Sequence, residues 1–337
     1  MPQPFLLSIV IPNRNRAQTL LRSLMSLEGQ TTDELDIIVV DDASETDLSA
    51  EYALAEKMGA RVLRQPRHLR GSAARNRGVA EARGTHVSFL DSDDIWLPGR
   101  YDDMKAFFAQ PENARRVLIC GALLHVGGEI RSSVQPQWQP GSSLVEYVYR
   151  DGARVQTSML TMQVDIARSH PFDETLRVNQ DTDLAMRLDR AGIGFTVSAQ
   201  PRLVKEETPR TDRLTTDNAT IEWSHAWYQR ESHDWSAAAK SGYHLQDRVW
   251  RLADAGRRGQ AMLSLGRSLF PPVSARETAR RAATLALGNR GYAALRRAYR
   301  KGSGDKSVPS DAAAILRIWQ DLDRRATAAT AAAIGAK

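Results

Sequence analysis

Short apolar runs alternate with segments of helical periodicity along the first 90 residues. Four runs rich in Ile, Val or Leu are typical of buried strands: residues 6–12 (LLSIVIP), 35–44 (LDIIVVDDAS), 61–65 (RVLRQ) and 86–90 (HVSFL). Between them, three segments have helical spacing of apolar residues: 17–29, 50–60 and 71–84. This alternation predicts an α/β fold with a Rossmann-like, mostly parallel sheet in a three-layer α/β/α arrangement.

The pattern loosens after about residue 115. Predicted elements follow in this order: a strand or hairpin at 117–128, an irregular loop at 131–143, a strand and short helix at 155–169, a helix at 180–192, edge strands at 193–207 and a polar loop at 208–218. Beyond about residue 235 the pattern indicates only short amphipathic helices, and the last nine residues, ATAAAIGAK, are expected to be frayed. We therefore expect an α/β domain over 1–235 and a helical extension over 236–337.

The composition is that of an ordinary globular protein. Of 337 residues, 42% are hydrophobic and 26% are charged. The single cysteine, Cys120, excludes a disulfide framework and is expected to be buried and inert. No apolar run approaches about 20 residues and no signal peptide is evident, so we expect a cytoplasmic protein without a spanning helix.

The net charge of +6 is divided unevenly along the chain. Residues 240–337 contain 19 Lys and Arg against 7 Asp and Glu, whereas the first 239 contain 27 against 33. In the basic region arginines interleave with apolar residues: Trp250, Leu252, Leu265, Leu269 and Leu295. Such helices either lie on the anionic inner face of the plasma membrane or pack on the α/β domain with a solvated basic face. Nucleic acid is not an expected partner, because no nucleic-acid-binding module accompanies the charge.

Three polar clusters each follow a predicted strand. They are Pro12-Asn13-Arg14, Asp41-Asp42 and Asp91-Ser92-Asp93-Asp94. Because ligands of open α/β sheets bind beyond the carboxyl ends of the strands, we expect the clusters to converge on one rim. Three carboxylates within four residues repel one another unless a cation lies among them. The last cluster is therefore either a solvated acidic loop or a metal site.

Four segments in series resemble the family 2 glycosyltransferases: SIVIPNRNR, IIVVDDAS, GSAARNRGVAEARGTHVSFLDSDDIWLPGR and FDETLRVNQDTDLAMRL. The resemblance covers roughly residues 5–215. It implies the GT-A fold, with a donor-binding half over about 1–115 and an acceptor half over about 116–235. It also implies transfer of a sugar from a nucleoside-diphosphate sugar, with UDP-sugars favoured, to a glycan or lipid-linked saccharide. Without spanning helices or a Gln-X-X-Arg-Trp motif, the chain resembles the non-processive, surface-polysaccharide type.

The resemblance assigns a metal site to the acidic cluster. Asp91-Ser92-Asp93 matches the Asp-X-Asp motif of the family, which implies that Asp93 binds Mn²⁺ or Mg²⁺. Asp91 then contacts the ribose or a metal-bound water. Such cations take hard oxygen ligands and would neutralise charge on the departing diphosphate.

The resemblance also implies a donor site. Asp42 matches the aspartate that accepts from the ring N–H of uracil, and Asp41 would support that turn. The remaining donor-site candidates are Pro12, Asn13 and Arg14 along the base, Arg75 near the base or diphosphate, and Arg210 and Arg213 against the diphosphate. An aromatic residue is frequent in the family where this chain has Arg14, which weakens any prediction of the base. For Arg75, Arg210 and Arg213, ordinary solvated arginines are the alternative.

Asp181 matches the general base of inverting members, which would deprotonate the acceptor hydroxyl. The usual Glu-Asp pair reads Gln180-Asp181 here, so only burial could raise the pKa of Asp181. The alternative is that Asp181 is simply a helix N-cap, and Asp183 is interpreted as structural.

Two further questions stay open at this level. Trp96 could line the sugar site or pack beneath the loop, and Trp138, Trp223, Trp227 and Trp235 could form an acceptor platform or belong to the core. Gln180 also leaves open a non-catalytic nucleotide-sugar or glycan binder. The stretch FLDSDDIW superficially resembles the Asp-X-Asp signature of a phosphohydrolase, but that signature belongs on a first strand.

Overall fold

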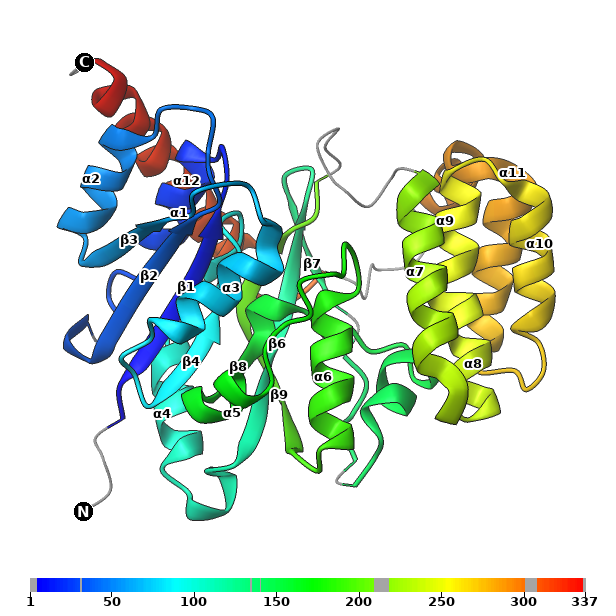
Figure 1. The fold of residues 1–337 in the computed structure, drawn as a ribbon. Helices are drawn as coiled ribbons and strands as arrows, with labels where there is room; N and C mark the ends of the chain where they lie inside the picture. Colours follow the sequence, from blue (N-terminus) through cyan, green and yellow to red (C-terminus); the bar gives the residue numbers. More distant parts are fainter. Residues whose placement is uncertain are drawn as a thin grey trace.

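The computed structural model describes residues 5–30, 32–133, 135–139, 141–208, 218–300 and 308–335. Its centre is a nine-stranded sheet of order β3-β2-β1-β4-β8-β6-β9-β5, with β7 paired to β6 (Figure 1). The first four strands run parallel: β1 (Leu7–Asn13), β2 (Leu35–Asp41), β3 (Ala60–Arg64) and β4 (His86–Phe89). They confirm the four predicted strands, and their apolar side chains are largely buried, as parallel strands covered on both faces require.

Three helices connect these strands: α1 (Ala17–Met25), α2 (Ser49–Lys57) and α3 (Arg70–Ala80). Since crossovers between parallel strands are right-handed, α1 and α2 cover one face of the sheet and α3 covers the other. Helix α3 lies very close to β1, because a Cβ built on Gly78 would be only 2.3 Å from Val10 Cγ1. The predicted three-layer arrangement is confirmed.

The second half of the sheet is mixed. The strands β8 (Leu160–Gln163) and β6 (Arg116–Val126) continue it in antiparallel fashion from β4, and β6 forms a hairpin with β7 (Glu129–Ser132). A strand is confirmed within 193–207 as the single 13-residue β9 (Gly194–Glu206), where more than one strand was expected. It pairs with β6 along its length and with the two-residue β5 (Ile95–Trp96) only at Leu203 and Val204, so most of it lies at the edge of the sheet. Three helices accompany this half: α4 (Arg100–Phe108), α5 (Val164–Ser169) and α6 (Gln180–Arg190).

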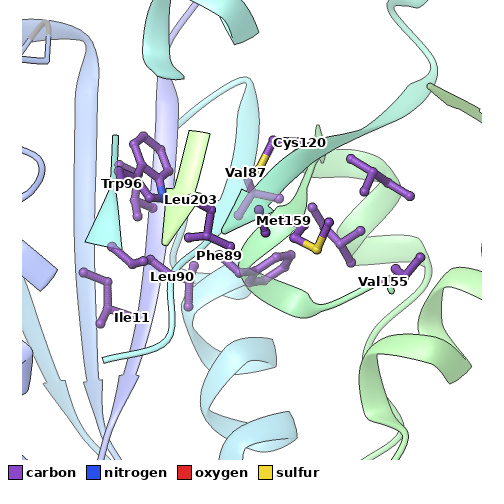
Figure 2. Close-up of a cluster of buried hydrophobic side chains, with 14 of the residues drawn as sticks. Ile11, Val87, Phe89, Leu90, Trp96, Cys120, Val155, Met159 and Leu203 are labelled. Carbon is purple, nitrogen blue, oxygen red and sulfur yellow. The ribbon is translucent and has the colours of Figure 1, made fainter. Parts of the chain in front are cut away.

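Side chains from both halves of the sheet form one continuous core. Figure 2 shows Val87 and Phe89 of β4 beside Leu203 of β9 and Cys120 of β6, all of them buried. Burial raises the pKa of the Cys120 thiol, in agreement with an inert cysteine. Trp96 is also almost fully buried in this core, so the packing alternative for Trp96 is confirmed.

Five helices of the C-terminal part lie together at one side of the sheet (Figure 1): α7 (Asn218–Glu231), α8 (Ala237–Tyr243), α9 (Val249–Asp254), α10 (Arg258–Arg267) and α11 (Ala275–Arg300). A small apolar cluster of their own includes Leu252, with Leu265 packed against it. Leu252 and Leu265 therefore pack between these helices, so the alternative that places them on a membrane-facing surface was wrong for these two residues. None of the helices in the described ranges is both long and apolar enough to span a bilayer.

The last helix, α12 (Ala312–Gly335), does not join that group. It packs against α1 and α2 beside the first strands, although the boundary at residue 235 assigned it to the helical extension (Figure 1). Helix α7, conversely, begins before that boundary and lies with the helical group. The expected fraying of ATAAAIGAK was wrong through Gly335, because α12 continues to that residue and Ala329 packs against the core. The helix also buries Trp319, Leu322 and Ala326 on one face.

Candidate active site

The three polar clusters converge at the carboxyl ends of β1, β2 and β4, as predicted. Asn13 and Asp41 are partners in the β1–β2 register, and the Asp42 N–H donates to the Asn13 carbonyl at 2.8 Å. The loop after β1 reaches the acidic cluster through Arg16, whose guanidinium lies 2.8 Å from Asp93 Oδ2. Parallel pairing of these strands thus brings residues about 80 positions apart in the sequence to one rim.

Arg75 links the acidic cluster to the start of α6. Its Nη2 donates to Asp91 Oδ1 at 2.6 Å and its Nη1 donates to Gln180 Oε1 at 3.3 Å. Burial alone would raise the pKa of Asp91, but Arg75, Lys205 and Arg16 together lower it. Arg75 is therefore a buried part of this site, and the alternative of an ordinary solvated arginine was wrong.

Side chains of α1 hold the backbone of the acidic cluster through hydrogen bonds. Arg22 Nη2 donates to the Asp93 carbonyl at 2.8 Å, and Ser23 Oγ donates to the Asp94 carbonyl at 2.6 Å. Asp94 is buried and accepts the Glu206 N–H at 3.1 Å. Burial and the neighbouring carboxylates of Asp93 and Asp91 raise the pKa of Asp94, whereas Lys205 lowers it. The third carboxyl group of the cluster is therefore a buried structural group.

Lys205 is a site residue that the sequence analysis missed. Although burial alone would lower its pKa, the carboxylates of Asp94, Glu207, Asp91 and Asp181 raise it. It therefore carries a positive charge among the carboxylates of the Asp-X-Asp segment and Asp181. Its only sequence signal is a lysine inside the apolar end of β9, and nothing there indicates which loop it faces.

The candidate base-binding residues make a dense network. Asp41 is fully buried and accepts the Ser44 N–H at 3.0 Å, as expected for support of a turn. Arg14 pairs with Glu45 at 2.7 Å, and Asn13 Nδ2 donates to the Tyr52 hydroxyl at 3.1 Å. Pro12 precedes them at the end of β1.

Asp42 already has four partners in the protein. Its Oδ1 accepts from Gln65 Nε2 at 3.0 Å and the Leu69 N–H at 2.7 Å, while its Oδ2 accepts the Arg70 N–H at 2.8 Å and lies 2.7 Å from His68 Nδ1. A carboxylate offers about four lone-pair positions. Asp42 therefore fixes the turn that precedes α3, which contains Arg70 at a φ of 75°.

Asp181 lies in the first turn of α6, next to Gln180, which accepts a hydrogen bond from Arg75. The N-cap of α6 is Asn179, so the interpretation of Asp181 as an N-cap was wrong. Asp181 Oδ1 accepts the Thr182 N–H at 2.8 Å, and the side chain is partly exposed. Asp183 is structural, as expected, because it is buried and accepts from Trp227 Nε1 at 2.9 Å.

The remaining candidates from the sequence are two arginines and four tryptophans. Arg210 and Arg213 lie outside the described residues. Trp227 and Trp235 are buried, so core packing is the correct interpretation for both. Trp138 is partly buried against the core, and the ring of Trp223 lies 4.7 Å from the Arg177 guanidinium.

The acidic cluster fits a hard divalent cation in the type of its ligands. Asp91 and Asp93 supply carboxylate oxygens, and each already faces an arginine. Within the described ranges no group of three or more His, Cys, Asp or Glu is arranged to hold a metal. Mg²⁺ sites of phosphate-transferring enzymes commonly need only one or two carboxylates, because phosphate and water complete the coordination.

Comparison with known proteins agrees with this geometry. The family model described as "Glycosyl transferase family 2" matches residues 8–164. The chain belongs to the family 2 glycosyltransferases and is a glycosyltransferase with the GT-A fold. It is 30% identical over 202 residues to the amylovoran biosynthesis glycosyltransferase AmsB of Erwinia amylovora, a match that spans 58% of this chain and 67% of AmsB.

Two other relatives extend the picture. The pre-mycofactocin glycosyltransferase of Mycobacterium tuberculosis is 32% identical over 200 residues, covering 55% of this chain and 39% of that protein. The crystal structure of S. aureus TarS, residues 1–349, in complex with UDP-GlcNAc superposes with a TM-score of 0.54 and 16% identity. That match covers 88% of this chain and 92% of TarS 1–349, and it shows the fold.

Proposed function

We propose that this protein is a metal-dependent, inverting glycosyltransferase that moves a sugar from a UDP-sugar to a saccharide or lipid-linked saccharide during synthesis of a bacterial surface polysaccharide. The observation that carries the proposal is the connection of Asp91, Arg75 and Gln180, which ties the Asp-X-Asp segment to the first turn of α6, where Asp181 lies. The polysaccharide assignment is supported by the AmsB relative, and the choice of UDP by the complex of TarS with UDP-GlcNAc.

In this proposal Asp93, with Asp91 beside it, holds Mn²⁺ or Mg²⁺, which neutralises charge on the diphosphate when bound. Arg16, Arg75 and Lys205 compensate the carboxylates and provide positive charge where the diphosphate oxygens would lie. Because the fold holds these three side chains in place, they stabilise the negative charge that develops on the leaving group without having to move.

Asp181 takes the acceptor proton. A bond forms between the acceptor oxygen and the anomeric carbon while the bond from that carbon to the diphosphate oxygen breaks, and the hydroxyl proton passes to the Asp181 carboxylate. A single displacement of this kind inverts the anomeric configuration. Lys205 is a cationic side chain near Asp181, and the Asp181 carboxylate is one of the groups that raise the pKa of Lys205.

The base would be read at the Asp42 turn, with Pro12, Asn13 and Arg14 along its edge. A direct hydrogen bond from uracil to Asp42 requires one of its four present donors to move. The exposed His68 is the side chain that can leave without exposing the interior, since the other three are a buried glutamine and two backbone N–H groups. We also propose that the basic C-terminal helices bind the anionic cytoplasmic face of the membrane.

The test is calorimetric titration of UDP, GDP and dTDP with and without Mn²⁺. We expect Mn²⁺-dependent UDP binding that is lost in Asp93→Ala and retained in the matched control Asp165→Ala, whose side chain is highly exposed on α5. Asp181→Asn should still bind UDP but should release UDP from UDP-sugars at least about a hundredfold more slowly. If no nucleoside diphosphate binds under any condition, the alternative of a glycan-binding protein without transfer replaces this proposal.

A further inference from the structure

Exposed apolar side chains are concentrated on one part of the molecule. Six of the seven large apolar side chains that are exposed within the described ranges lie between residues 250 and 287: Trp250, Met262, Leu263, Leu269, Phe270 and Leu287. An exposed apolar patch rimmed by polar residues marks an interaction site more often than chance. The α/β part of the chain, by contrast, contributes none of the seven.

Helix α10 and the turn that follows it carry the three most exposed of these side chains. Ala261 and Ser264 are buried and mark the face toward the neighbouring helices. Met262, Leu263 and Phe270 are 58%, 71% and 85% exposed. With 3.6 residues per turn, Met262 and Leu263 stand on the face opposite the buried one. Figure 1 shows α10 at the outer edge of the helical group, far from the sheet.

Arginines flank this apolar face on both sides. Arg258 and Arg267 are exposed at the first and last positions of α10, about 180° apart around the helix and on either side of Met262 and Leu263. Between Ala255 and Arg276 the sequence contains four arginines and no Asp or Glu. Of the four, Arg257 pairs with Glu222, whereas Arg258, Arg267 and Arg276 have no ion pair with any residue of the described ranges.

We propose that the α10 surface, formed by Arg258, Met262, Leu263, Arg267 and Phe270, docks on an anionic lipid leaflet. The helix would lie in the plane of the leaflet, with its apolar side chains at the boundary between headgroups and acyl chains and its arginines on the lipid phosphates. A second copy of this chain is the less suitable occupant, because a symmetric contact would bring arginines against arginines without a carboxylate between them. This inference specifies which surface of the protein would meet the membrane. Its biological role rests on the proposed function, although docking itself requires no sugar-nucleotide donor.

The experiment is sedimentation of the full chain with vesicles of equal parts phosphatidylglycerol and phosphatidylcholine, compared with phosphatidylcholine alone. We expect binding to the anionic vesicles only, weakening as salt is raised. Arg258→Gln/Arg267→Gln should weaken the partition coefficient about fivefold for each arginine. Met262→Gln/Leu263→Gln/Phe270→Gln should weaken it further, since these side chains supply the buried apolar area.

Arg83→Gln/Arg115→Gln is the matched control, because both arginines are exposed on the α/β part and the change in net charge is the same. Equal vesicle binding by the control and by the α10 arginine variant overturns the proposal, as does equal binding to both vesicle types. A lower oligomeric mass of the apolar variant with unchanged vesicle binding would also overturn it and assign the surface to contacts between copies. Titration of UDP with Mn²⁺ into the same proteins tests the proposed function separately, because the α10 substitutions lie outside the donor site.

Discussion

Replacing Arg22 by methionine tests how α12 is attached to the acidic cluster. The buried Arg22 guanidinium lies 4.0 Å from the centre of the Trp319 ring, 2.9 Å from Asp323 Oδ1 and 2.8 Å from the Asp93 carbonyl. Trp319 in turn stacks on His125 of β6 at 4.3 Å. One side chain of α1 therefore holds both the last helix of the chain and the backbone of the Asp-X-Asp segment.

The expected cost follows from these contacts. Removing one partner of a buried ion pair typically costs about 3–5 kcal/mol, because the other charge is left without compensation. Asp323 is 40% exposed, so water relieves part of that penalty, and methionine keeps the aliphatic packing on Trp319. We therefore expect α12 to lose about 3 kcal/mol of protection against opening.

Hydrogen exchange followed by mass spectrometry measures this directly, since it reports local opening of one helix. Amides of α12 should exchange on the order of a hundredfold faster in Arg22→Met, while those of α7 to α10 stay unchanged. Arg324→Met, at a side chain on the same helix that is 79% exposed, serves as the control and should change little. Unchanged exchange of α12 in Arg22→Met would refute the reasoning and assign the attachment of α12 to apolar contacts alone.

Three further substitutions test the fold and the site. Gly78→Ala should destabilise by about 2 kcal/mol in thermal unfolding, because its Cβ would clash with Val10 at 2.3 Å. Burial lowers the pKa of His86 to about 4 in the folded protein, so between pH 6.5 and 4 the unfolded chain binds a proton that the folded protein does not. The free energy of unfolding should therefore fall by up to about 1.4 kcal/mol per pH unit as the pH drops from 6.5 toward 4. In urea unfolding at several pH values, His86→Phe should reduce that slope, and an unchanged slope would exclude His86 as its source. Asp183→Ala should lower the free energy of unfolding by about 3 kcal/mol, because Arg187 and the Trp227 N–H lose their acceptor. The affinity for UDP should be unchanged.

Local patterns in the sequence were sufficient to predict the first four strands and the helices between them. Runs such as LLSIVIP and LDIIVVDD report burial on both faces of a strand, and helices between them impose parallel pairing. Parallel pairing alone then places Asp42 and Asp91 at the same rim, because the carboxyl ends of such strands share one edge. The metal-binding role of Asp93, by contrast, is implied by the resemblance to the family and stays a prediction.

Contacts between distant positions were decided only by the tertiary structure. Arg22 and Asp323 are 301 residues apart, and helical periodicity shows that α12 has an apolar face without showing what covers it. The partners of Arg75 and the surroundings of Lys205 likewise depend on how β9 and α6 pack against the first strands. An amphipathic pattern also cannot separate Leu252, which packs inward, from Met262, which faces solvent, because burial depends on which neighbouring helices are present. The sequence by itself thus determined the first four strands, the helices between them and which polar residues reach the rim. Packing determined which charges meet there and which apolar side chains remain exposed, because both depend on contacts between distant parts of the chain.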